Sequence, residues 1–254
     1  MNPTLLFAGL AFIFGTIIGS FLNVLIYRIP KKLNFVSGRS MCPHCEHPLS
    51  AWDLFPIVSY LALGRKCRYC HAPISWRYPV FEAITGLSFA LLVLRFGASL
   101  DTLPVVLIGW VLAAVLITLS GIDLDTMEFD DGFSITIGLL AIGFIVLTNG
   151  SITWHLVGAF AISLPMLGIA FMTGGFGGAD IKLMAAAGLL LGFPNILVAF
   201  MLGIIFGSIQ AIVLLRQGKS GKTMMPFGPH LALGIFVAFL YAPLIIQWYL
   251  GFFN

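Results

Sequence analysis

PTLLFAGLAFIFGTIIGSFLNVLI, residues 3–26, is the stretch that decides the class of fold, because no charged residue interrupts it. A helix of about 20 apolar residues is long enough to cross the hydrocarbon core of a bilayer. No basic segment precedes the stretch, as it would in a secretory signal peptide, so we expect a retained first span. Gly15 and Gly19 form a GxxxG pair, which predicts close packing against a neighbouring helix rather than contact with a substrate.

The rest of the chain is equally apolar. Of its 254 residues, 59% are hydrophobic and 9% are charged, with a mean hydropathy of +1.04. Soluble domains average about 25% charged and 45–50% apolar residues, so this composition predicts an all-α membrane protein with about eight transmembrane helices. The later spans are expected at residues 80–94, 103–120, 132–147, 154–172, 182–191, 196–215 and 230–250, and the sixth span, 182–191, is unusually short.

All four cysteines lie in the one sizeable polar segment, residues 28–78, as two CxxC knuckles: Cys42 with Cys45, and Cys67 with Cys70. The stretch between the knuckles is slightly longer than the about 15–20 residues typical of a structural zinc site. Two knuckles supply four thiolates and complete a tetrahedron, which predicts structural rather than catalytic Zn²⁺. A pair of disulfides is the alternative. Because four cysteines already complete the predicted zinc site, the nearby histidines are expected to be surface residues: His44, His47 and His71.

Basic residues predict the orientation, because cytoplasmic loops of membrane proteins are enriched in lysine and arginine. On the predicted topology only Arg95 falls on the outer side, and the inner side carries Arg28, Lys31, Lys32, Arg39, Arg65, Lys66, Arg68, Arg77, Lys182, Arg216, Lys219 and Lys222. This places both termini outside and the zinc loop inside, a reducing compartment that disfavours disulfides. The net charge of +3 therefore gives no indication of nucleic-acid binding. The expected division is a first transmembrane helix at 1–27, a cytoplasmic zinc-binding loop at 28–78 and a seven-helix membrane core at 79–254.

The same topology brings two acidic segments to the cytoplasmic face: IDLDTMEFDD, residues 122–131, and GGADIKL, residues 177–183. A charge within a membrane helix costs roughly 2.5–3.5 kcal/mol on insertion scales, so Asp180 is first considered functional. A carboxylate pair shares a proton near neutral pH and can supply both the base and the acid for peptide hydrolysis. Asp123 is the deepest candidate partner, whereas Glu128 and Asp130 are expected to be solvated loop charges. For Asp180 alone, capping a helix that begins at Ile181 is an equally good explanation.

The neighbouring Lys182 is expected to extend its charge to the membrane interface. Contact with an acidic substrate group is the alternative for this lysine.

Several stretches, in order along nearly the whole chain, resemble the type IV prepilin leader peptidase family of GxGD-type membrane aspartyl proteases. Besides the paired CxxC loop, they are GSFLNVLIYRIP (19–30), PISWRYP (73–79) with Glu82, IDLDT (122–126), GGADIKL (177–183) and PFGP (226–229). The chain departs from the family pattern where Ala179 replaces the second glycine of GxGD. It also departs where Asp130 replaces proline ahead of Asp131, and where His230 replaces a larger apolar residue.

The resemblance implies that Asp123 and Asp180 are the catalytic pair. It implies cleavage of type IV prepilin or pseudopilin precursors after a glycine, at the cytoplasmic face of the bacterial inner membrane. It further implies methylation of the new amino terminus from S-adenosylmethionine, because the complete zinc loop is typical of the bifunctional subgroup. The methyl-transfer activity rests on the resemblance alone.

Two other classes of function fit some of the same features. In a membrane transporter or channel, Asp123, Asp180 and Lys182 would line an ion path, and the short span would be a discontinuous helix. The acids lie at one membrane face rather than at the midplane, which disfavours this alternative. A membrane scaffold would use the zinc loop to bind a cytoplasmic partner.

Overall fold

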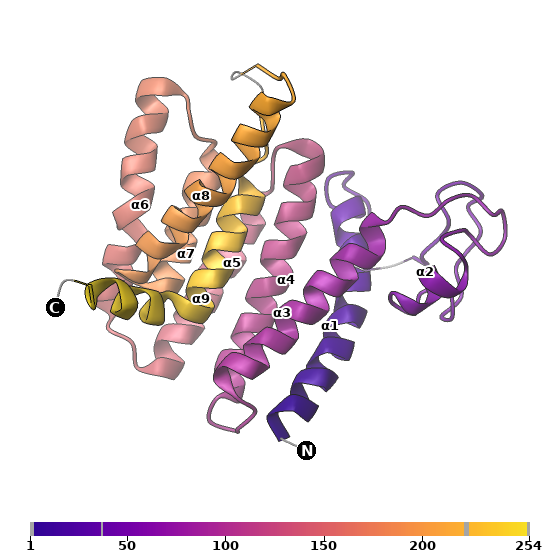
Figure 1. Cartoon of the computed structure of the whole chain (residues 1–254), viewed down its shortest axis with the longest axis horizontal. Helices are drawn as coiled ribbons and strands as arrows, with labels where there is room; N and C mark the ends of the chain where they lie inside the picture. Colours follow the sequence, from indigo (N-terminus) through magenta and orange to yellow (C-terminus); the bar gives the residue numbers. More distant parts are fainter. Residues whose placement is uncertain (1–2, 37, 221–223, 253–254) are drawn as a thin grey trace. The chain divides into compact units, whose positions relative to one another are not determined.

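The computed structural model describes residues 3–36, 38–220 and 224–252, and Lys222 of the topology prediction lies outside these residues. Within them the secondary structure is helical, apart from two isolated β-bridges. The helices are α1 (Pro3–Arg28), α2 (Val58–Ala62), α3 (Arg77–Phe96), α4 (Leu103–Thr126), α5 (Asp131–Thr148), α6 (Ile152–Thr173), α7 (Gly178–Leu191), α8 (Asn195–Arg216) and α9 (Gly228–Leu250) (Figure 1). The all-α membrane fold predicted from sequence is therefore confirmed.

Every predicted span coincides with a helix, and the differences concern length. Among the described residues, 7 helices are long and apolar enough to cross a membrane, while α7 has 14 residues and is not one of them. Helix α4 continues to Thr126, beyond the predicted end at residue 120, so Asp123 lies on a helix rather than in a loop. Helix α9 is continuous but bends near Pro243, whose ring cannot fit a straight helix interior (Figure 1).

The chain forms two compact units, Met1–Thr118 and Leu119–Asn254. In the first unit α1 packs along α3 (Figure 1). A Cβ atom on Gly15 would lie 2.8 Å from the Gly86 Cα, and one on Gly19 would lie 2.7 Å from the Glu82 Cα. The two glycines therefore provide the close helix packing predicted from the GxxxG pattern.

Polar groups connect the cysteine-bearing loop, residues 28–78, to this helix pair. The buried Glu82 of α3 accepts a hydrogen bond of 2.7 Å from the Ile57 backbone N–H, directly ahead of α2. Asn23 of α1 donates its side-chain N–H to the Tyr78 carbonyl at 3.2 Å. These bonds satisfy polar groups at the point where the chain passes from the loop into the helices.

In the second unit α7 packs against α5 and α6, and α8 packs against α9. Helix α7 begins after Gly177 and ends at Gly192, whose φ of 72° lies in the region that favours glycine. Helix α7 is shorter than α5 and α6, against which it packs. Its first turn lies at the end of this unit where α4 ends and α9 begins.

Replacing Gly19 by leucine is expected to destabilise the first unit, because the new side chain would enter space occupied by the α3 backbone. Overpacking of this kind costs about 1–3 kcal/mol, so the melting temperature of the detergent-solubilised protein should fall by several degrees. Gly9→Leu is the matched control, since a Cβ on Gly9 meets nothing within 4 Å. Equal melting temperatures for the two variants would contradict the packing role.

Candidate active site and metal centre

The four predicted zinc ligands come together in the first unit. One sulfur atom from each of Cys42, Cys45, Cys67 and Cys70 lies within 4.8 Å of the others, and the Cys42 and Cys70 sulfurs are 3.8 Å apart. Four thiolates at about 2.3 Å from one Zn²⁺ stand about 3.8 Å apart at tetrahedral angles. The cluster therefore fits a tetrahedral metal ion.

The disulfide alternative does not fit these distances. A disulfide requires sulfurs about 2.05 Å apart, and all four cysteines are free. Burial alone would raise the pKa of the Cys42 thiol, but hydrogen bonds from the backbone at Cys45 and His44 lower it to about 6. A thiol that ionises easily is suited to bind a metal as thiolate.

The two knuckles have the same backbone geometry, which the sequence prediction did not anticipate. In the first, Cys42 N–H donates to the His47 carbonyl at 3.0 Å, and Met41 bridges to Pro48. In the second, Cys67 N–H donates to the Ala72 carbonyl at 2.9 Å, and Lys66 bridges to Pro73. The shared proline after each CxxC motif could have revealed the duplication.

Asp53 links the segment between the knuckles to the second knuckle, and sequence reasoning missed it. Its side chain is 3% exposed, and it accepts hydrogen bonds from Arg68 Nε at 2.6 Å and from the Ser50 hydroxyl at 2.8 Å. Burial would raise the pKa of Asp53, but the bonds from Arg68 and Ser50 hold it at about 2. Asp53 is therefore a charged anchor inside the loop.

Asp123 lies in the last turn of α4 and is 4% exposed. The negative end of a helix dipole is unfavourable for a carboxylate. Its Oδ2 atom accepts a hydrogen bond of 2.9 Å from the backbone N–H of Gly228, the first residue of α9. A Cβ on Gly228 would lie 2.8 Å from this oxygen, so only glycine permits the contact. The PFGP stretch thus holds one of the two predicted acids.

Asp180 is half-buried in the first turn of α7. The cap of that helix is Gly177 rather than Asp180, and it makes no side-chain capping bond, so the capping prediction for Asp180 was wrong. Asp180 lies within electrostatic reach of Asp123, because a Coulombic interaction links the two carboxyl groups. The structure therefore brings together the two acids that sequence analysis paired.

The charged residues that neighbour the two acids in sequence have other partners or are exposed. Lys182 of α7 pairs with Asp131 of α5 at 2.6 Å, and both side chains are more than half exposed. Asp130 caps α5 by accepting a hydrogen bond of 2.7 Å from the Gly132 N–H. Glu128 and Asp130 are exposed, as predicted. These contacts give Lys182 and Asp130 structural partners outside the pair.

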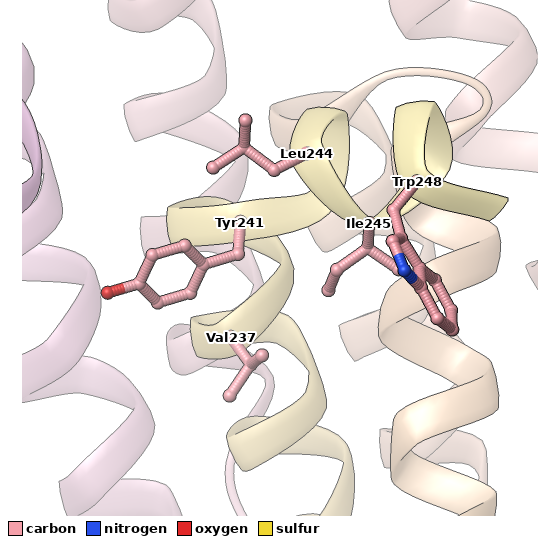
Figure 2. Close-up of a pocket in the computed structure, with 5 residues that line it drawn as sticks. All are labelled: Val237, Tyr241, Leu244, Ile245 and Trp248. Atoms are coloured by element: carbon pink, nitrogen blue, oxygen red, sulfur yellow. The ribbon is translucent and has the colours of Figure 1, made fainter. Parts of the chain in front are cut away.

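Hollows on the helix surfaces lie elsewhere. Figure 2 shows one on α9, lined by Val237, Tyr241, Leu244, Ile245 and Trp248 at the bend near Pro243. Its lining is almost entirely apolar and includes no carboxylate. This hollow therefore offers no acidic side chain for proton transfer.

Two protein families match consecutive parts of the chain. Residues 13–96 match the bacterial peptidase A24 N-terminal domain, and residues 110–212 match the type IV leader peptidase family. The second match includes both Asp123 and Asp180. No solved structure matches the chain.

Individual relatives are similar over almost the whole length. A prepilin leader peptidase/N-methyltransferase of Bacillus subtilis (strain 168) is 36% identical, covering 94% of this chain and 96% of the relative. One of Aeromonas hydrophila is 34% identical, covering 96% and 94%, and one of Legionella pneumophila is 32% identical, covering 94% and 93%. The resemblance stated from the sequence motifs is thereby confirmed, and the chain belongs to the type IV leader peptidase family of aspartic proteases.

Proposed function

We propose that this protein removes the leader peptides of type IV prepilin-like precursors, cleaving after a glycine, with Asp123 and Asp180 as its catalytic pair. The observation that supports the assignment is the electrostatic proximity of these two acids, one in the last turn of α4 and one in the first turn of α7. Membership of an aspartic protease family and near-complete coverage of prepilin leader peptidases support it.

The pair supplies the two proton-transfer functions that hydrolysis needs. The ionised carboxylate accepts a proton from water, whose oxygen attacks the carbonyl carbon of the scissile bond. The protonated carboxyl donates a hydrogen bond to the carbonyl oxygen, where negative charge develops. Breaking the C–N bond then requires a proton on the leaving nitrogen, which the carboxyl protonated in the first step can return. Two nearby carboxyl groups hold one proton between them, because like charges at short range do not both ionise.

The same relatives and the distribution of basic residues support the assignment of a substrate class, of a membrane and of an orientation in it. We assign the protein to the bacterial inner membrane, as a multi-pass protein with the zinc loop and the acid pair facing the cytoplasm. Prepilin or pseudopilin precursors and membrane lipid are its partners. The basic residues of the loop support this orientation. The division into 1–27, 28–78 and 79–254 remains a prediction, because the two compact units reflect contacts and not sides of a membrane.

N-methylation is the second activity that we assign, supported by the names of relatives with which the whole chain aligns. S-adenosylmethionine is the methyl donor that this activity implies. The described residues contain no strands beyond two isolated bridges and hence no glycine-rich βαβ unit, so they do not fit the usual nucleotide-binding fold. No step of methyl transfer is therefore assigned to particular residues.

Zinc is assigned to the four-cysteine cluster in a structural role. Four protein ligands leave no open coordination position, so the metal would stabilise the loop and not bind a substrate. The segment is small and its large apolar side chains, including Trp52 and Phe55, are exposed, so a hydrophobic core contributes little to its stability. Metal binding supplies the missing stability in domains of this kind.

Asp123→Asn and Asp180→Asn are each expected to lower processing of a co-expressed prepilin at least about a thousandfold, because amides neither accept nor donate the required proton. Cleavage and methylation are read together by mass spectrometry of the precursor. Both variants should be inserted in the membrane at wild-type levels.

Asp125→Asn and Asp130→Ala are the controls for this pair. Asp125 is exposed on the same helix as Asp123, and Asp130 caps α5, so its loss affects stability by about 1 kcal/mol and leaves the chemistry intact. Equal loss of processing in either control would mean that the catalytic pair has been misassigned.

Replacing Cys42 and Cys67 by serine, or removing the metal with a chelator, is expected to unfold the zinc loop. Purified wild-type protein should contain about one zinc per chain by elemental analysis. Limited proteolysis should then cut the residues between the knuckles only in the serine variant or after chelation. Wild-type protein free of metal would remove the assignment.

Asp53→Asn should weaken the loop at neutral pH, because the ion pair with Arg68 is lost. Arg68 is half exposed and its charge is screened by solvent, which limits the effect to a severalfold faster transfer of zinc to a chromogenic chelator. The pKa of Asp53 is lowered from about 3.9 in the unfolded chain to about 2, so this stabilisation is complete above pH 4 and is lost as the pH falls towards 2. Glu46→Gln, the same charge change at an exposed position of the loop, should transfer zinc at the wild-type rate.

A further inference from the structure

The turn that precedes α9 contacts the surroundings of both aspartates. Gly228 N–H donates to Asp123, as described above. The adjacent Phe227 ring lies 6.1 Å from the ring of Phe176, in the loop that leads into α7 and Asp180. The position of this turn therefore bears on both halves of the acid pair.

Helix α8 packs against this turn on the side of the Phe227 ring. A Cβ on Gly207 of α8 would lie 3.0 Å from the Phe227 ring, so the ring is seated directly on the helix backbone. Further along the interface, a Cβ on Gly234 of α9 would lie 2.2 Å from the Ala199 carbonyl oxygen. Backbones packed this closely allow α9 little movement relative to α8.

One polar pair crosses this small-residue interface. His230 Nε2 of α9 lies within hydrogen-bond distance of Gln210 Oε1 of α8. A side-chain amide oxygen can only accept, so the imidazole carries its proton on Nε2 and donates it. Hydrogen bonds between membrane helices have few competing partners in an apolar environment, so the pair selects one register of the two helices.

His230 and Gly228 belong to the same helical turn, whose first bond runs from His230 N–H to the Phe227 carbonyl at 3.1 Å. The imidazole and the Gly228 amide are therefore carried by one helical turn. We propose that His230 is a positioning residue for Asp123: its hydrogen bond to Gln210 holds the first turn of α9 where the Gly228 amide meets the carboxylate. The inference rests on the proposed function, because it takes Asp123 to be catalytic.

Loss of the hydrogen bond between His230 and Gln210 should slow the chemical step of the reaction. Misplacing a catalytic carboxylate by a fraction of an ångström slows proton transfer, while contacts that bind the precursor elsewhere are unaffected. Losing the His230–Gln210 bond should therefore lower kcat about tenfold and change KM less than about twofold. Because the two residues act as one unit, the double variant should be no slower than either single variant.

The test compares His230→Leu, Gln210→Leu and the double variant with the wild-type protein in cleavage of a purified prepilin. Gln210→Glu keeps an oxygen acceptor opposite His230 and should restore kcat to within about threefold. Ser208→Leu introduces the same side chain at an exposed position of α8 and should behave as wild type. Hydrogen exchange of the peptide containing residues 224–231 is measured in parallel and should be about tenfold faster in both single leucine variants.

The outcomes separate the inference from the proposed function. Wild-type kcat and unchanged exchange in His230→Leu, with Asp123→Asn inactive, would overturn the positioning role and leave the function intact. Additive losses in the double variant would also overturn it. If wild-type protein fails to cleave prepilin, the proposed function fails, and the exchange measurement still decides whether His230 and Gln210 hold the Gly228 turn.

Discussion

The hydrogen bond from the Gly228 amide to Asp123 is the interaction on which the arrangement of the acid pair depends. A buried carboxylate in the last turn of α4 faces the negative end of its own helix dipole and has little access to water. The first amide of α9 offsets both penalties, because helix N-termini offer unpaired N–H groups and a favourable dipole.

The two acids have the same kind of electrostatic environment. Asp180 lies within the first turn of α7, and Asp123 contacts the first residue of α9, so each carboxyl group is placed at a helix N-terminus. Glycine is required at the second of these contacts because a Cβ on Gly228 would lie 2.8 Å from the Asp123 oxygen. Ala179, where the family pattern has glycine, lies inside the helical part of α7, where alanine is well tolerated. Its departure from the motif therefore needs no change in the path of the chain.

Sequence patterns predicted features that depend on composition and spacing. The apolar stretches located every helix except α2, Gly15 and Gly19 marked a close helix contact, and the paired CxxC motifs identified a four-thiolate cluster. Features that depend on tertiary contact were missed. The extension of α4 past residue 120 and the burial of Asp123 are two such features, which no hydropathy average reveals. Asp53, Gly228 and Gln210 each act through a partner distant in sequence, and a single sequence gives no sign of such pairs.

The cysteine cluster and the acid pair belong to different compact units. The cysteine cluster and its Asp53 anchor lie wholly within Met1–Thr118, while Asp123, Asp180 and the Gly228 turn lie wholly within Leu119–Asn254. The boundary falls inside α4, which runs without a break from the first unit to the acid at its end. Within the described residues, the cysteine cluster and the acid pair are therefore built from separate parts of the chain.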